Sequence, residues 1–224
     1  MKKWVSRIIL CILIPAVVIG GATLFREKRY AWLSLAVAVL ACIPFFLRFE
    51  RSAADAKRLV LVAVMTALSV LGRILFAPIP SFKPVTATVV LTAMYFGPEA
   101  GFLTGALSAV VSNFYFGQGA WTPFQMFAWG TVGFLGGLLA RPLKRSRIVL
   151  AVYGVLAGVL YSFLMDIWTV IWIDGYFNLP RYFTAIGTAA SVTVIYAVSN
   201  VVFLELFSYP IGKILGRVKT KYGL

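Results

Sequence analysis

Long apolar runs separated by short clusters of charged residues constrain the fold of this chain more than any other feature. A helix that crosses the hydrocarbon core of a bilayer needs about 20 apolar residues, with a range of about 17 to 25. The candidate segments are residues 8–25, 31–47, 59–77, 85–97, 99–115, 123–140, 148–173 and 184–208. We therefore predict an all-α, multi-pass protein of the cell membrane.

Composition and charge placement support this prediction. The chain is 61% hydrophobic and 12% charged, whereas a soluble domain carries roughly 25% charged residues. A formal charge of +14 would suggest nucleic-acid binding in a soluble protein. Here most Lys and Arg residues fall on one side of the predicted membrane, which predicts cytoplasmic termini and contact with membrane lipids but not with nucleic acid. The basic cluster at residues 26–29 is the exception to this bias.

The longest polar stretch, residues 48–58, divides the chain. We predict a two-helix membrane hairpin at residues 1–50, a polar linker at 51–58 and a six-helix substrate-binding membrane domain at 59–224. Basic residues before the first apolar run also occur in signal peptides. The second apolar run follows so closely that we favour an uncleaved helix.

Gly97-Pro98 predicts a turn between the fourth and fifth helices, because proline suits a first helical position.

Small residues four positions apart lie on one face of a helix and allow another helix to approach closely. Ala63 and Ala67 have this spacing, and it is consistent with either a docking face or packing inside the bundle. The spacings Gly101, Gly105, Ala109 and Gly154, Gly158 are interpreted as packing.

Three loops, 78–84, 116–123 and 174–182, are predicted on the outer side and are rich in aromatic, amide and turn-forming residues. Either they bind a ligand or their aromatic residues anchor the protein at the membrane interface. The candidate ligand-binding residues of these loops are Lys83, Gln118, Trp121, Asp174, Tyr176, Asn178 and Arg181.

Polar side chains within the predicted hydrocarbon zone are also candidates, because a charge there costs several kcal/mol unless it is paired or solvated. They are Arg73, Asn113, Gln125 and Asp166. Arg73 and Asp166 could form an internal ion pair. Alternatively, the four residues line a polar pocket beneath the outer loops.

The sequence lacks the motifs of energy-consuming chemistry. It contains no Gly-x-x-x-x-Gly-Lys-[Ser/Thr], no His-Glu-x-x-His and no Gly-x-Ser-x-Gly. Histidine is absent, and the two cysteines, Cys11 and Cys42, lie within apolar runs. We therefore predict no enzymatic activity, no metal site, no disulfide and no cofactor.

The segment 61–139 resembles the substrate-binding S components of energy-coupling factor (ECF) vitamin transporters. The similarity rests on the segments 63–67 (AVMTA), 82–87 (FKPVTA), 96–102 (FGPEAGF), 112–119 (SNFYFGQG) and 121–126 (WTPFQM). The six apolar runs between residues 58 and 210 match the number of helices in S components, whereas the two N-terminal helices are additional.

The resemblance implies that the chain captures a vitamin from outside and delivers it with a membrane scaffold (T) component and two cytoplasmic ATPases. It implies that Ala63 and Ala67 dock on the scaffold and that the outer loops cap the ligand. Cobalamin or a precursor is the ligand favoured by the resemblance. A self-sufficient secondary transporter of a small metabolite is the alternative, but the internal repeats expected of that class are not evident. An assembly factor would have no use for the intramembrane Arg73 and Asp166.

Overall fold

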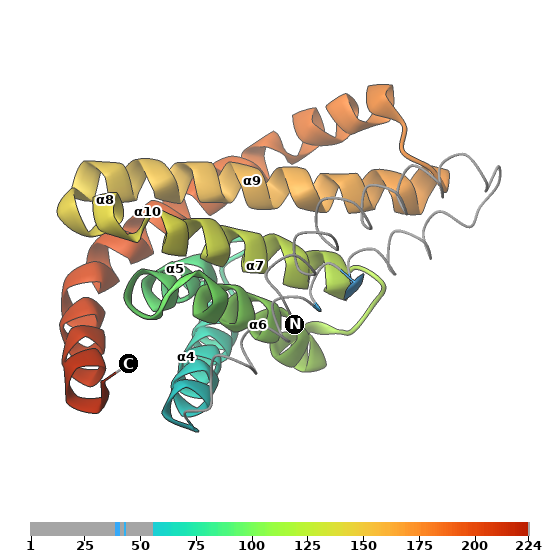
Figure 1. Ribbon diagram of the computed structural model, residues 1–224. Helices are drawn as coiled ribbons and strands as arrows, with labels where there is room; N and C mark the ends of the chain where they lie inside the picture. Colours follow the sequence, from blue (N-terminus) through green and yellow to red (C-terminus); the bar gives the residue numbers. More distant parts are fainter. Residues whose placement is uncertain (1–38, 41–42, 44–55, 224) are drawn as a thin grey trace, which may run out of the picture.

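The computed structural model describes residues 39–40, 43 and 56–223, and the described part of the chain contains helices and no strand (Figure 1). The predicted hairpin at residues 1–50 lies almost entirely outside the described residues, as does most of the predicted linker. The helices are α4 (Ala56–Leu75), α5 (Val85–Phe96), α6 (Pro98–Phe116), α7 (Thr122–Leu138), α8 (Ala140–Arg145), α9 (Arg147–Asp174) and α10 (Leu179–Tyr222).

Each of the six helices predicted after residue 58 has a counterpart, which confirms an all-α membrane fold. The predicted turn at Gly97-Pro98 is also confirmed, because α6 begins at Pro98 and Gly97 has a φ of +99°. Several boundaries differ from the prediction, including those of α10 described below. Helix α4 begins inside the predicted linker, and the short helix α8 separates α7 from α9. In the described part, three helices are long and apolar enough to cross a membrane, within 57–75, 147–174 and 179–222.

Helix α5 is the centre of the bundle. Every residue from Val85 to Met94 is buried, as expected for a helix that is apolar on all sides. Two of its threonines bond locally, since Thr88 donates to the Pro84 carbonyl and Thr92 to the Thr88 carbonyl. These two hydroxyl groups therefore do not need partners from other helices, and the surrounding helices can pack against α5 directly.

Helices α6 and α7 cross with their backbones in close contact. A Cβ atom added to Gly105 would lie 2.5 Å from the Trp129 carbonyl oxygen, and one added to Gly101 would lie 2.9 Å from the Gly133 carbonyl oxygen. The predicted packing role of Gly101 and Gly105 is thus confirmed. Gly158 has the same role between α9 and α10, because a Cβ there would lie 2.8 Å from the Ala197 nitrogen.

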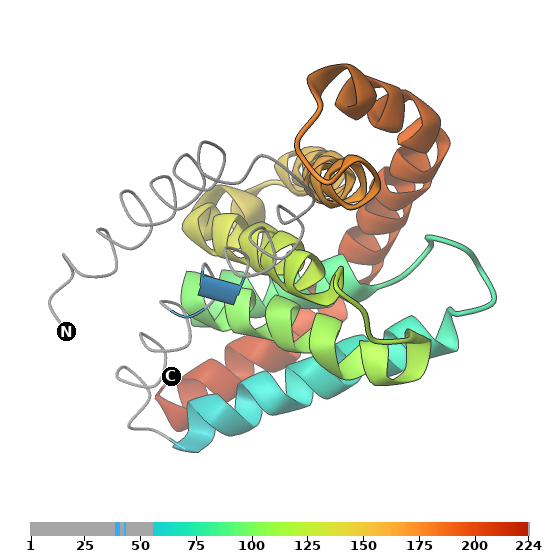
Figure 2. The same ribbon diagram turned by 90° about the vertical axis from the view of Figure 1, so that its right-hand side faces the viewer.

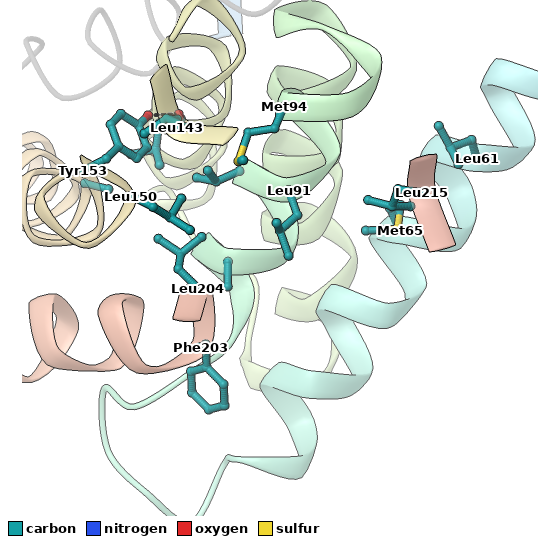
Figure 3. Close-up of a cluster of buried hydrophobic side chains, with 14 residues drawn as sticks. Leu61, Met65, Leu91, Met94, Leu143, Leu150, Tyr153, Phe203, Leu204 and Leu215 are labelled. Carbon is teal, nitrogen blue, oxygen red and sulfur yellow. Dashed lines mark hydrogen bonds between the residues drawn. The ribbon is translucent and has the colours of Figure 1, made fainter. Parts of the chain in front are cut away.

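Helix α10 bends within its 44 residues and contains Pro210. Its first part lies along α9, and its C-terminal part turns toward the start of α4 (Figure 1). There Leu215 joins the main hydrophobic core together with Leu61 and Met65 (Figure 3). The sequence predicted that this helix would end at residue 208. It continues to Tyr222.

Candidate functional site

Two loops lie on the same side of the bundle. The segment between α4 and α5 and the segment between α6 and α7 extend toward one side of the molecule (Figure 2). The ends of α4 and α6, which carry Arg73 and Asn113, meet the start of α7, which carries Gln125. Sequence-distant polar residues are thereby brought to one place.

Arg73 occupies the last turn of α4 and points at α6. Its Nη1 atom donates to the hydroxyl of Ser112 and, at 2.8 Å, to Oδ1 of Asn113. The guanidinium carbon lies 4.4 Å from the centre of the Phe116 ring and 5.0 Å from that of Trp129. These distances allow cation–π attraction, which helps to stabilise a charge that is removed from water.

Asn113 connects Arg73 to the rest of a hydrogen-bond network. Its Nδ2 atom donates to Oγ1 of Thr122 at 3.0 Å and to Oε1 of Gln125 at 2.8 Å. Gln125 in turn donates from Nε2 to the Tyr161 hydroxyl at 2.9 Å. A buried network whose members bond to one another holds a defined geometry. We call the residues Arg73, Ser112, Asn113, Thr122, Gln125 and Tyr161 the Arg73 network.

Lys83 adds a second positive charge near Arg73. Its Nζ atom donates to the carbonyls of Phe76 and Ala77 at 2.7 and 3.2 Å and lies 5.8 Å from the centre of the Phe116 ring. Burial, and secondarily the charge of Arg73, lower the pKa of the Lys83 ammonium from its usual value. The positive charges of Lys83 and Arg73 therefore repel each other.

Asp166 does not belong to this network. The suggested ion pair with Arg73 is wrong, because Arg73 contacts Ser112 and Asn113 instead. Salt bridges in the described part of the chain join Arg181 to Asp174 and Arg147 to Glu205. Asp166 is buried on α9, and its Oδ2 atom has no hydrogen-bond partner among the described residues.

Three other predicted residues form a separate group, which we call the loop cluster: Asp174, Asn178 and Arg181. Arg181 Nε lies 2.6 Å from Asp174 Oδ1, and Asn178 Nδ2 donates to Asp174 Oδ2 at 2.9 Å. Asn178 also caps α10, because its side chain accepts a hydrogen bond from the Arg181 nitrogen. The loop cluster therefore fixes the turn between α9 and α10.

The remaining loop residues differ in their surroundings. Gln118 donates to the Val110 carbonyl and accepts from Thr122, so it ties its loop to α6 and to the Arg73 network. The residues Trp121 and Tyr176 are 41% and 51% exposed. Their predicted contact with a ligand stays a prediction.

Ala63 and Ala67 lie on an exposed face of α4. They alternate with Val64 and Leu68, which are each 50% exposed, whereas Met65 on the opposite face is 2% exposed. This face therefore does not pack inside the described bundle. Whether a scaffold covers it stays a prediction.

Comparison with known protein families identifies the family of this chain. The model of the family described as the ECF-type riboflavin transporter S component matches residues 54–217, which is most of the sequence. The chain belongs to this family. It is therefore an S component, the type of membrane subunit that binds the substrate of an ECF transporter for a vitamin. No curated protein and no solved structure matches the chain.

Several network residues were not predicted from the sequence. Ser112, Thr122 and Tyr161 take part through hydroxyl groups, and Trp129 stacks on Tyr161 with ring centres 5.2 Å apart. A tyrosine inside an apolar run is a usable signal, because a buried phenol usually needs a hydrogen-bond partner. Serine and threonine give no such signal, because in helices they often bond to their own backbone.

Proposed function

We propose that this S component captures a vitamin at the Arg73 network and delivers it through a T component and two cytoplasmic ATPases. The observation that carries the proposal is the buried network itself. It joins α4, α6, α7 and α9 through polar groups next to the aromatic rings of Phe116 and Trp129. Apolar surroundings with a few well-placed polar groups are typical of small-molecule sites.

A flavin is the vitamin that we favour. The matched family is described by riboflavin, which supports a flavin over the cobalamin suggested by the sequence resemblance. A planar aromatic ring would also suit a site bordered by aromatic side chains. Titration calorimetry of the purified protein with riboflavin and with cobalamin tests this choice. Binding of cobalamin alone would restore the corrinoid assignment.

We further propose that the exposed face of α4 docks on the T component, with both termini in the cytoplasm. Small side chains there would allow close approach of a partner helix. Replacing Ala63 and Ala67 together by Leu should prevent assembly and uptake while ligand binding persists. Ala190→Leu, at an exposed position of α10, is the matched control and should assemble normally. A double variant that still transports at the wild-type rate would show that this face contacts only lipid.

A further inference from the structure

The charges beside the Arg73 network are unbalanced. Arg73 and Lys83 lie 4.4 and 5.8 Å from the centre of the same Phe116 ring. Neither forms a salt bridge within the described part of the chain, where Asp174 and Glu205 pair with other arginines. Two cations held near each other and partly removed from water repel, and their attraction to the Phe116 ring compensates this only in part.

Both cations also keep hydrogen-bond donors available. The described contacts of the Arg73 guanidinium use Nη1, and no hydrogen bond to the described residues involves Nε or Nη2. The Lys83 ammonium has three protons and donates to two carbonyl oxygens. A guanidinium and an ammonium with free donors suit the oxygen atoms of a carboxylate or phosphate.

The position of this pair is accessible from the loop side. Phe116 is 37% exposed, and Arg73 and Lys83 are half-buried. An anion bound by the free donors of the two side chains would leave the bonds from Arg73 Nη1 to Ser112 and Asn113 in place.

We propose that the substrate of this S component carries a negatively charged group, a carboxylate or a phosphate, that binds between Arg73 and Lys83 beside Phe116. The inference rests on the proposed function, because it concerns the ligand of the same site. The Arg73 network would then orient the neutral part of the molecule, and the two cations would select for its charge.

Matched pairs of ligands test the proposal on the purified full-length protein. Each pair contains a neutral compound and its anionic counterpart: riboflavin and riboflavin 5′-phosphate, pyridoxal and pyridoxal 5′-phosphate, nicotinamide and nicotinate, biotin amide and biotin. Calorimetry should show that, in the pair that binds, the anionic member binds about tenfold or more tightly, the scale of one charge-assisted hydrogen bond. Lys83→Gln should remove this preference, and Lys83→Arg should retain it. Lys144→Gln, which removes an equal charge near Tyr95 at the opposite end of α5, should leave it unchanged.

The outcomes separate the two proposals. Equal or tighter binding of the neutral member would overturn the anionic substrate while leaving vitamin capture intact. A preference that survives in a folded Lys83→Gln protein would show that the two cations do not select the charge. If no member of any pair binds to the folded wild-type protein, capture of a small vitamin at this site fails, and the anionic substrate fails with it.

Discussion

The Arg73 network and the loop cluster both join an arginine to amide side chains, yet they differ in burial and in charge. In the Arg73 network, Asn113 is 1% exposed, and the arginine has no carboxylate partner in the described part of the chain. In the loop cluster, the Arg181 side chain is 49% exposed and pairs directly with Asp174. One cluster keeps a net positive charge inside the bundle, and the other is neutral at its edge.

The clusters also differ in how far apart their members lie in the sequence. The loop cluster spans residues 174–181 and needs only one turn to form. The Arg73 network joins residues from four helices, so only the folded bundle can assemble it. We infer that the loop cluster shapes a turn, whereas the Arg73 network is the part that recognises a ligand.

The largest expected effect follows from replacing the residue that joins the Arg73 network. Asn113→Leu would remove the buried hydrogen bonds of Asn113 to Arg73, Thr122 and Gln125, at a cost of about 3 kcal/mol. We expect a clearly lower melting temperature and no measurable vitamin binding in calorimetry. Asn178→Leu is the matched control in the loop cluster and should reduce stability much less. Equal losses from both variants would remove the distinction between the clusters.

A smaller effect is expected at the exposed aromatic residues near the two clusters. If the rings of Trp121 and Tyr176 cover a bound ligand, Trp121→Ala should weaken binding by about 1 kcal/mol or more, and Tyr176→Ala should also weaken it. Affinity is measured on the purified variants, with melting temperature as the control for folding. Wild-type affinity in the double variant would mean that both rings serve only as membrane anchors.

Asp174→Asn should have a weaker effect still. It removes the ion pair with Arg181, and because the Arg181 side chain is 49% exposed, the pair should contribute only about 0 to 1 kcal/mol. We expect a slightly lower melting temperature, a difference that shrinks in high salt, and a vitamin affinity close to that of the wild type. Loss of binding in a folded Asp174→Asn protein would make the loop cluster part of the ligand site.

The smallest effect is expected from deleting residues 1–50, because every candidate ligand residue lies after residue 58. The truncated protein should bind its vitamin with nearly unchanged affinity. A folded truncation that no longer binds would show that the N-terminal segment completes the site.

The sequence predicted the helical body well because apolar length is a direct requirement of the bilayer. It underestimated α10, since a hydropathy window stops at the basic residues after Pro210. The extension nevertheless shows helical periodicity, because Ile211, Leu215 and Val218 recur on one face and pack against the core. Attention to that amphipathic pattern would have extended the helix correctly.

Prediction of the site was less complete. Arg73, Asn113 and Gln125 were found because polar groups inside a membrane are costly, and the structure joins them. Asp166 was grouped with them for the same reason. The cost of a polar group inside the membrane does not, however, determine which polar residues contact one another. That depends on how α9 packs, which the spacing of residues along one helix does not determine.

The central claim is that the ligand binds at the Arg73 network, and paired arginine variants test it most directly. Vitamin affinity should be measured by calorimetry for the wild type, Arg73→Gln and Arg181→Gln, each confirmed as folded by its melting temperature. We predict that Arg73→Gln lowers the affinity for the vitamin by a factor of about 100, the scale of two charge-assisted hydrogen bonds. Arg181→Gln should bind the vitamin with nearly the affinity of the wild type. A folded Arg73→Gln protein with wild-type affinity, or loss of binding in Arg181→Gln alone, would contradict the claim.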